Sequence, residues 1–291
     1  MNARFIPGRR RALAALAAAA ASPWLARAQQ NAGPYVPTPW KIVEEMLNLA
    51  EIRADDFVMD LGSGDGRLVI SAAERFGARG YGVDIDRELV KLANANAAKA
   101  GVAARVRFEE RDLFETSLGE ATVLTLYLLP HTVTQLVPRI LAEMRPGARV
   151  VSHDYPLAPW PPDRHLQFEL EEKVYISGTT RTVLYRYTVP ARVGGDWTLE
   201  LPPALGRAPG RLAIFQRPER VLGTALIGGK TSQLEQVTIR GEDVSFAIAD
   251  LPRRGHSLRF SGKARGDVIE GLVTLPRGEA PWRATRVAGK N

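Results

Sequence analysis

The chain has 291 residues, 45% hydrophobic and 24% charged, which is long enough for two domains with sizeable cores. It contains no cysteine, which excludes disulfide bonds and thiolate metal sites. The net charge of +7 is unevenly distributed: residues 1–28 carry five arginines and no acid, residues 29–190 carry 18 basic and 22 acidic residues, and residues 191–291 carry 16 and 10. Because the central part is mildly acidic, no nucleic-acid partner is expected.

The first 28 residues have the pattern of a bacterial export signal. Arg9-Arg10-Arg11 precedes an alanine-rich apolar stretch, and Ala26-Arg27-Ala28 forms a small-residue ending. The arginine pair resembles the twin-arginine type, which carries folded proteins. We therefore predict a signal peptide at 1–28 and a periplasmic or exported protein, or a cytoplasmic one if the signal is not used. The alternative for this segment is a frayed, alanine-rich helix.

From residue 38 onward, helix and strand patterns alternate. Thr38 is expected to cap a helix that begins at Pro39 and extends to about residue 50. Further helices are expected at 67–76, 87–100 (closed by Gly101) and 132–143, and strands at 57–61, 80–85, 106–109, 122–128 and 149–153. Continuous apolar strands between helices predict an α/β fold with a mostly parallel sheet that is covered on both faces.

After Tyr155 the pattern becomes strand-like throughout. Residues 166–176 and 180–189 predict an antiparallel hairpin that finishes the sheet, with its turn at Ser177-Gly178. Residues 193–195 read as a linker, and the short strands beyond it predict a small all-β sandwich or barrel. The expected organisation is therefore a catalytic domain at 29–192 and a β domain at 196–291.

A glycine-rich loop, Asp60-Leu61-Gly62-Ser63-Gly64-Asp65-Gly66, follows the first strand directly. Glycines permit unusual backbone conformations and let a ligand approach the main chain closely. The spacing differs from the dinucleotide fingerprint, and the Gly-Lys-Ser/Thr ending of a P-loop is absent. The loop therefore indicates a nucleotide-type ligand of another kind, or an ordinary turn.

Two further acids follow successive strands. Asp84, about 20 residues beyond the loop, is suited to accept hydrogen bonds from ribose hydroxyls. Asp112 is suited to accept a hydrogen bond from the amino group of adenine, with Leu113 or Phe114 packed against the ring. Each acid also has a plain structural interpretation: a cap for Asp60, a turn residue for Asp84 and a solvated loop charge for Asp112. Their shared position at strand ends, where open α/β sheets bind ligands, favours an adenosine-type site.

These residues resemble the class I S-adenosylmethionine-dependent methyltransferases. The blocks Pro34–Thr38, Asp60–Arg67 and His153–Trp160 are similar to the branch of mitochondrial protein-lysine methyltransferases that act on the ADP/ATP translocase and on ATP synthase subunit c. The likeness runs from about residue 34 to 160 and implies a Rossmann-like sheet and S-adenosyl-L-methionine as cofactor. This chain departs from those relatives in its export signal and its β-rich tail.

The resemblance also implies roles for individual residues. Gly62, Gly64 and Gly66 would approach the methionine part of the cofactor, Asp84 the ribose and Asp112 the adenine. The full set of candidate cofactor-binding residues is Asp60, Gly62, Ser63, Gly64, Gly66, Asp84, Ile85, Asp112 and Leu113. Tyr35 and Pro37 are expected to wall the substrate channel, because the N-terminal segment of this fold commonly lies across the cofactor.

No residue stands out as a catalytic base. Tyr127, His131, His153 and Asp154 lie near strand ends, and for each a structural role is favoured over a catalytic one. The four histidines show no metal-ligand spacing, so no metal is expected.

Three functions remain open. They are protein-lysine N-methylation, methylation of a small molecule such as a lipid or quinone, and non-catalytic binding of an adenosine-like ligand. The complete set of cofactor acids argues against the third. The partner is therefore a protein or small-molecule methyl acceptor, and the C-terminal β domain is suited to substrate docking or to envelope association.

Overall fold

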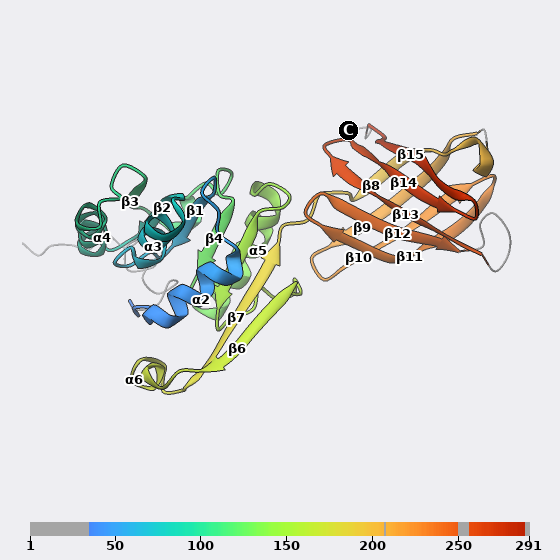
Figure 1. Ribbon diagram of the computed structural model, residues 1–291. Helices are drawn as coiled ribbons and strands as arrows, with labels where there is room; N and C mark the ends of the chain where they lie inside the picture. Colours follow the sequence, from blue (N-terminus) through green and yellow to red (C-terminus); the bar gives the residue numbers. More distant parts are fainter. Residues whose placement is uncertain (1–34, 207, 250–255, 289–291) are drawn as a thin grey trace, which may run out of the picture.

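The computed structural model describes residues 35–206, 208–249 and 256–288, which form an α/β unit and a β-barrel with separate hydrophobic cores (Figure 1). The predicted export signal lies outside the described residues. Among the helices described, none has both the length and the apolar character needed to span a bilayer.

The α/β unit is built on one seven-stranded sheet. Its strands are β1 (Phe57–Leu61), β2 (Arg79–Asp84), β3 (Val106–Glu110), β4 (Val123–Leu126), β5 (Arg149–His153), β6 (Arg164–Glu169) and β7 (Arg181–Thr188). Its α-helices are α2 (Trp40–Ala50), α3 (Arg67–Phe76), α4 (Arg87–Lys99), α5 (Pro130–Glu143) and the short α6 (Val174–Ser177), with 3₁₀ turns at Leu113–Glu115 and Glu171–Lys173.

The strand order is β3-β2-β1-β4-β5-β7-β6, with β1 to β5 parallel and β7 antiparallel to both of its neighbours. This arrangement confirms the predicted parallel sheet with an antiparallel hairpin at its end. The order reverses between β1 and β4, and open α/β sheets bind ligands at such a switch point, beyond the carboxyl ends of the strands.

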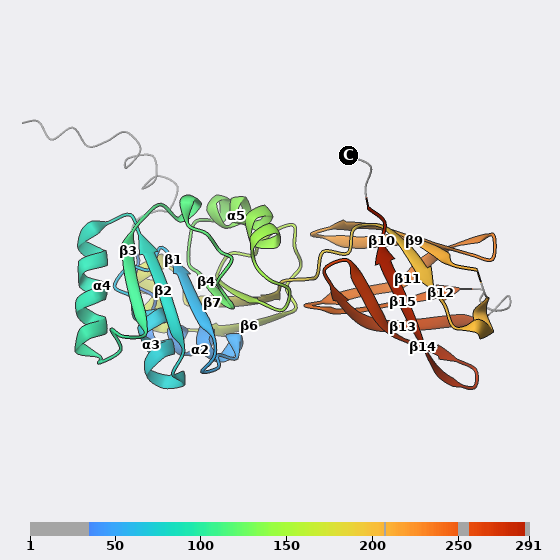
Figure 2. The ribbon, with the colours of Figure 1, turned by 90° about the horizontal axis from the view of Figure 1, so that it is seen from above.

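Helices cover both faces of the sheet. The apolar side chains of α5 pack with Met59, Leu61, Leu124 and Leu126 in one core. Helices α2 and α3 pack with Val58 and residues of β4, β5 and β7 on the opposite face, where α4 joins α3 against β3. Figure 2 shows α5 on the other side of the sheet from α2 and α3. Burial on both faces explains the continuous apolar runs of the strands.

The predicted cap of the first helix is wrong. Pro39 occupies the N-cap position of α2, without a side-chain cap. Thr38 is buried before the helix, and its carbonyl oxygen accepts a hydrogen bond from Arg67 Nη1 at 2.7 Å. A contact to a residue 29 positions further on thus replaces the local capping bond.

The predicted ends of two strands are also wrong. Strand β4 stops at Leu126 because Pro130 begins α5 two residues earlier than expected, which leaves Tyr127–Leu129 as a loop. Strand β6 stops at Glu169, and residues 171–177 form helical turns instead of more strand. The polar run Glu171-Glu172-Lys173 breaks the alternation that a half-buried strand requires.

The C-terminal unit is a closed eight-stranded antiparallel barrel, one of the two forms predicted. Its strands are β8 (Gly195–Glu200), β9 (Gly210–Arg217), β10 (Arg220–Ile227), β11 (Lys230–Arg240), β12 (Asp243–Ala249), β13 (Ser257–Arg265), β14 (Val268–Leu275) and β15 (Gly278–Arg286). Phe246, Phe260 and Trp282 pack in its interior with ring centroids 5.0–5.5 Å apart. Side chains therefore fill this small barrel, as expected for eight strands.

The barrel is joined to the sheet at the end opposite the expected ligand site. The Ala191 N–H donates to the Gly241 carbonyl at 2.7 Å, and the backbone of Gly241 lies against Gly147, two residues before the start of β5. The Arg192 guanidinium also donates to the Ala142 carbonyl at the end of α5. The barrel thus meets the amino end of β5, whereas ligands bind at the carboxyl ends.

We therefore expect residues 29–190 to fold alone and to bind cofactor with the affinity of the full chain, within about twofold. The two cores share no residue, and Ala191 and Val193 belong to the barrel core, which sets the cut at Pro190. Calorimetry on the fragment and on residues 29–291 compares the two affinities. An insoluble fragment, or one with weaker binding, would show that the barrel supports the α/β unit.

Candidate cofactor and acceptor site

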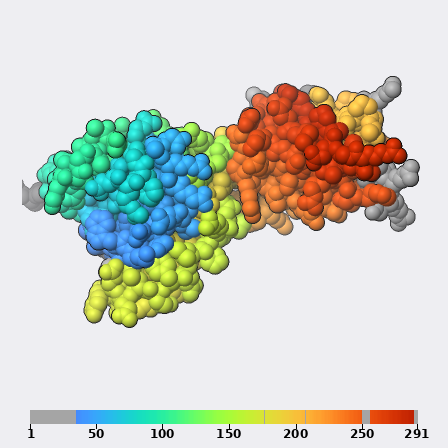
Figure 3. Space-filling view, viewed as in Figure 1, coloured from blue at the N-terminus to red at the C-terminus, as the bar shows by residue number. Residues whose placement is uncertain are grey.

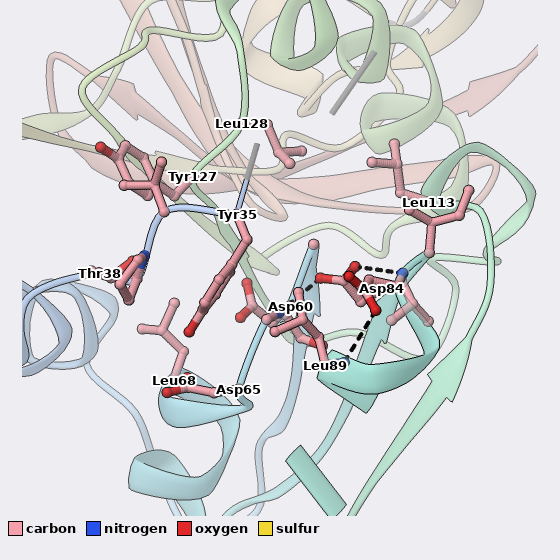
Figure 4. A pocket seen from close by; sticks show the side chains of 18 of the residues that line it. Tyr35, Thr38, Asp60, Asp65, Leu68, Asp84, Leu89, Leu113, Tyr127 and Leu128 are labelled. Atoms are coloured by element: carbon pink, nitrogen blue, oxygen red, sulfur yellow. Dashed lines mark hydrogen bonds between the residues drawn. The ribbon is translucent and has the colours of Figure 1, made fainter. Parts of the chain in front are cut away.

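A cavity of about 570 Å³ opens beyond the carboxyl ends of β1, β2 and β4 (Figure 4). Its volume lies in the range of pockets that hold small ligands. It is lined by most of the residues predicted from the sequence: Tyr35, Pro37, Asp60, Gly62, Ser63, Gly64, Asp84, Ile85, Asp112, Leu113 and Tyr127. In Figure 4, Tyr35 stands between Asp84 and Leu113 on one side and Tyr127 and Thr38 on the other.

The glycine loop is held against the end of β2 by its own backbone. The N–H groups of Gly62 and Ser63 both donate to the Val83 carbonyl at 2.9 Å. Gly64 has a φ of +54°, and a Cβ atom there would lie 2.4 Å from the Tyr35 ring. Glycine at this position therefore permits both the turn and the close approach of the ring that closes the pocket.

Gly66 is placed differently from the prediction, because it does not line the cavity. It is the N-cap of α3 with a φ of +83°, and a Cβ atom there would lie 2.7 Å from the Phe108 ring and 3.0 Å from Ala93. The structure gives this glycine a packing role: it brings α3 close to β3 and α4.

Asp84 connects the glycine loop to the next helix. Its Oδ2 accepts the Gly64 N–H at 2.9 Å and its Oδ1 accepts the Asp86 N–H at 3.0 Å, as Figure 4 shows. Two donors fix the carboxylate, which still has lone pairs available toward the cavity. At this position the carboxylate can accept hydrogen bonds from two neighbouring hydroxyl groups of a ligand.

The side of the cavity beside Asp84 is largely apolar. Ile85, Leu89 and Leu113 line it, and Asp112 lies at its edge. Asp112 Oδ1 accepts the Phe114 N–H at 2.7 Å, so this carboxylate also caps the 3₁₀ turn. Asp86 and Arg111 line the cavity as well. An apolar surface with hydrogen-bonding groups beside it fits a planar heterocycle that carries an amino group.

Asp60 is buried in the centre of the site. Its Oδ1 accepts the Thr125 hydroxyl at 2.8 Å. Burial raises the pKa of Asp60 to about 7; the Thr125 hydrogen bond opposes this shift, and the nearby Asp84 and Asp65 carboxylates add to it. The site therefore favours a cationic ligand group, which would stabilise the ionised form of Asp60.

The opposite half of the cavity is lined by tyrosines. Tyr35, Tyr127 and Tyr155 contribute to it, together with Pro37 and Thr38. Burial, with the nearby Asp154 carboxylate as a smaller cause, raises the pKa of Tyr127 to about 12. Its hydroxyl thus stays protonated at neutral pH, which disfavours Tyr127 as a base and leaves it as a neutral residue of the cavity wall.

His153 and Asp154 lie behind this wall and do not line the cavity. The His153 ring packs against the Tyr127 ring in a tilted arrangement with centroids 3.9 Å apart, and burial lowers the pKa of His153 to about 4. His153 is therefore neutral at pH 7, and its contact to Asp154 at 3.5 Å is not an ion pair. Asp154 binds Lys173 instead, at 2.6 Å. This geometry gives neither residue direct access to a substrate.

Several lining residues were missed in the sequence, and Leu89, Tyr155 and Ser177 are examples. Leu89 lies in the first turn of α4, a segment for which only a helix was predicted. Tyr155 follows β5 at the ligand-binding edge, a position that was a usable signal. Ser177 was not predicted as a lining residue because its segment was expected to form a strand and a turn and not a helix.

The residues of the cavity fit S-adenosylmethionine part by part. Asp84 suits the ribose, the apolar surface suits the adenine, and the glycine loop with Asp60 suits the positively charged methionine part. Fold and site together define a class I S-adenosylmethionine-dependent methyltransferase.

Comparison with known proteins agrees with this class. Residues 60–164 match the family described as the ANTKMT methyltransferase domain. A protein-lysine N-methyltransferase of Saccharolobus islandicus is 39% identical over 157 residues, which cover 54% of this chain and 93% of that protein. The adenine nucleotide translocase lysine N-methyltransferase of Mus musculus is 39% identical over 130 residues, which cover 44% of this chain and 56% of that protein. The chain belongs to the methyltransferase family of these relatives.

Among solved structures, an RNA methyltransferase from Salinibacter ruber in complex with S-adenosyl-L-homocysteine is 48% identical to this chain. The match covers 54% of this chain and 96% of that chain, with a TM-score of 0.49.

Proposed function

We propose that this methyltransferase transfers methyl groups to the side-chain amine of lysine in a polypeptide. The observation that carries the proposal is the extent of the likeness to the archaeal protein-lysine N-methyltransferase, which includes 93% of that protein. The tyrosine-lined half of the cavity supports it, because the faces of aromatic rings attract ammonium groups.

The cofactor, when bound, supplies an activated methyl group on a sulfonium. The residues of this chain align the amine and exclude water, and alignment at about 3–3.5 Å supplies much of the rate in such transfers. A lysine amine, with an ordinary pKa near 10.4, must first lose its proton. Enclosure between Tyr35, Tyr127 and Tyr155 desolvates the amine and lowers that pKa, as does a neighbouring positive charge. The proton leaves to solvent at the open mouth.

Labelled cofactor added to a cell-envelope extract with the protein (residues 29–291) tests this proposal. We expect label in the protein fraction, recovered after hydrolysis as methyl-lysine, and much less label with Asp84→Ala at a limiting cofactor concentration. Label in the organic-soluble fraction would indicate a lipid or quinone acceptor, and label in RNA would indicate a nucleic acid. Either result would contradict the lysine proposal.

We also propose that the protein is exported by the twin-arginine route. The support is the arginine pair at 10–11 before the apolar stretch. Folding before transport would let the protein cross with its cofactor already bound. Replacing Arg10 and Arg11 with lysines should then abolish export and leave activity in lysates intact. Equal periplasmic protein after this change would contradict the route.

We further propose that the barrel associates with the cell envelope. Phe215 and Leu222 pair across β9 and β10 and are exposed, and Arg217 and Arg220 pair beside them. Neither arginine has an ion-pair partner among the residues that the structure describes. A face that combines arginines with apolar side chains is suited to an anionic membrane surface. The same fractionation reports whether exported protein sediments with membranes and is released by high salt.

A further inference from the structure

The segment from β6 to β7 forms an arm that projects from the α/β unit (Figure 1). Figure 3 shows this arm, residues 164–188, as a yellow-green lobe beside the main body. Its tip consists of the 3₁₀ turn and α6, and Ser177 at the end of α6 lines the cavity. The arm thus extends the surface of the protein outward from the mouth of the cavity. We call the tyrosine-lined half of this cavity the acceptor half.

A buried ion pair holds the tip in place. Lys173 is 1% exposed, and its Nζ lies 2.7 Å from Asp154 Oδ1 and 2.6 Å from Asp154 Oδ2. It also donates to the Arg181 carbonyl. Removing one partner of a buried pair leaves an uncompensated charge, so this contact strongly favours one position of the tip.

The Lys173–Asp154 pair is connected by hydrogen bonds and packing to the wall of the cavity. The Asp154 N–H donates to the Val183 carbonyl at 2.7 Å, and Asp154 Oδ1 accepts the Val183 N–H at 3.2 Å. The ring of the neighbouring His153 packs against Tyr127, which lies in the tyrosine-lined acceptor half of the cavity. The tip is therefore fixed relative to the point at which an acceptor side chain enters.

The outer surface of the tip is both apolar and acidic. Tyr175 is 93% exposed and Val174 is 43% exposed, while Glu171 and Glu172 beside them are exposed. The basic residue of the tip, Lys173, is buried in its pair and does not neutralise this surface. Exposed tyrosines are enriched in surfaces that bind other proteins.

We propose that this tip is the docking surface for the polypeptide acceptor, and that it holds a basic segment while the lysine enters the cavity past Ser177. The inference rests on the proposed function. Glu171 and Glu172 complement arginines and lysines of the acceptor, and Tyr175 with Val174 supplies apolar contact. Because the tip is fixed, it contributes to the binding of the acceptor chain and not to the transfer itself.

The first test compares two triple variants. The tip variant carries Glu171→Gln, Glu172→Gln and Tyr175→Ala; the control carries Glu235→Gln, Glu279→Gln and Leu272→Ala, all exposed on the barrel. The probes are a peptide with one lysine flanked by arginines, the same peptide flanked by glutamates, and n-butylamine. We expect kcat/KM for the arginine-flanked peptide to fall about tenfold in the tip variant only. Cofactor affinity and the rate with n-butylamine should not change.

The outcomes separate the two proposals. Equal kcat/KM of parent and tip variant for the arginine-flanked peptide would overturn the docking surface and leave lysine methylation standing. Equal kcat/KM of the parent for the two peptides would also overturn it, because the charge complementarity would then be absent. Absence of methyl transfer to both peptides in the parent would contradict the proposed function and with it the docking surface.

The second test measures binding without catalysis. Since the chain has no cysteine, Tyr175→Cys and the control Leu272→Cys each introduce a single thiol. With S-adenosyl-L-homocysteine present, the arginine-flanked peptide should slow alkylation at 175 and not at 272. Equal rates with and without peptide would overturn the proposal. Protection that grows with protein concentration alone would identify a second copy of the chain as the occupant, and would also overturn it.

Discussion

Asp60→Asn should make the protein more stable at pH 8 and bind its cofactor less well. The folded-state pKa of Asp60 is about 7, above its ordinary value of 3.8, so the folded protein retains a proton that the unfolded chain has released. The contribution of Asp60 to the free energy of unfolding is therefore largest below about pH 4. This contribution, up to a few kcal/mol, is lost as the pH rises through 7. Asparagine keeps an acceptor for the Thr125 hydroxyl and carries no charge.

The melting temperature of Asp60→Asn should thus exceed that of the parent by several degrees at pH 8 and match it near pH 4. Cofactor affinity should fall about 10–100-fold at pH 8, because a cationic ligand loses its buried counter-charge. Below pH 6 the cofactor affinity of the parent should approach that of the variant. Asp55→Asn, at an exposed position, is the control. Parallel pH dependences in parent and Asp60→Asn would show that Asp60 does not titrate near 7.

The features that sequence predicted well are those set by neighbouring residues. Helix α3 and strands β1 and β5 have the predicted bounds, since apolar spacing and the glycine loop define them locally. The positions of Asp84 and Asp112 follow from the topology, because parallel strands bring their carboxyl ends to one edge. Much of the cavity was therefore predictable once the strands were recognised.

The features that sequence missed depend on contacts between distant residues. The position of the tip depends on Lys173, which pairs with Asp154, 19 positions earlier, and no local pattern records that contact. Barrel closure likewise depends on the pairing of Arg286 with Trp197 at the two ends of the β domain. Strand and turn patterns do not distinguish this closure from a sandwich, so both forms had to remain open.

Asp84→Asn should weaken cofactor binding about 10–100-fold, which corresponds to roughly 1.4–2.8 kcal/mol. Both carboxylate oxygens of Asp84 accept backbone N–H groups in the structure, from Gly64 and from Asp86. Asparagine replaces one of these acceptors with a donor, which would face one of those N–H groups. The remaining oxygen must then serve the backbone and the ribose together, so at least one donor loses its partner.

The control is Asp86→Asn, two residues further along the same edge. Asp86 also lines the cavity, but its side chain caps α4 by accepting the Glu88 N–H at 2.8 Å. Asparagine caps helices as well as aspartate does, so this variant removes one negative charge and keeps the cap. Calorimetry should show a large loss for Asp84→Asn and a change below about threefold for Asp86→Asn. Equal losses would assign the effect to net charge at the rim, and unchanged affinity in Asp84→Asn would remove Asp84 from the cofactor site.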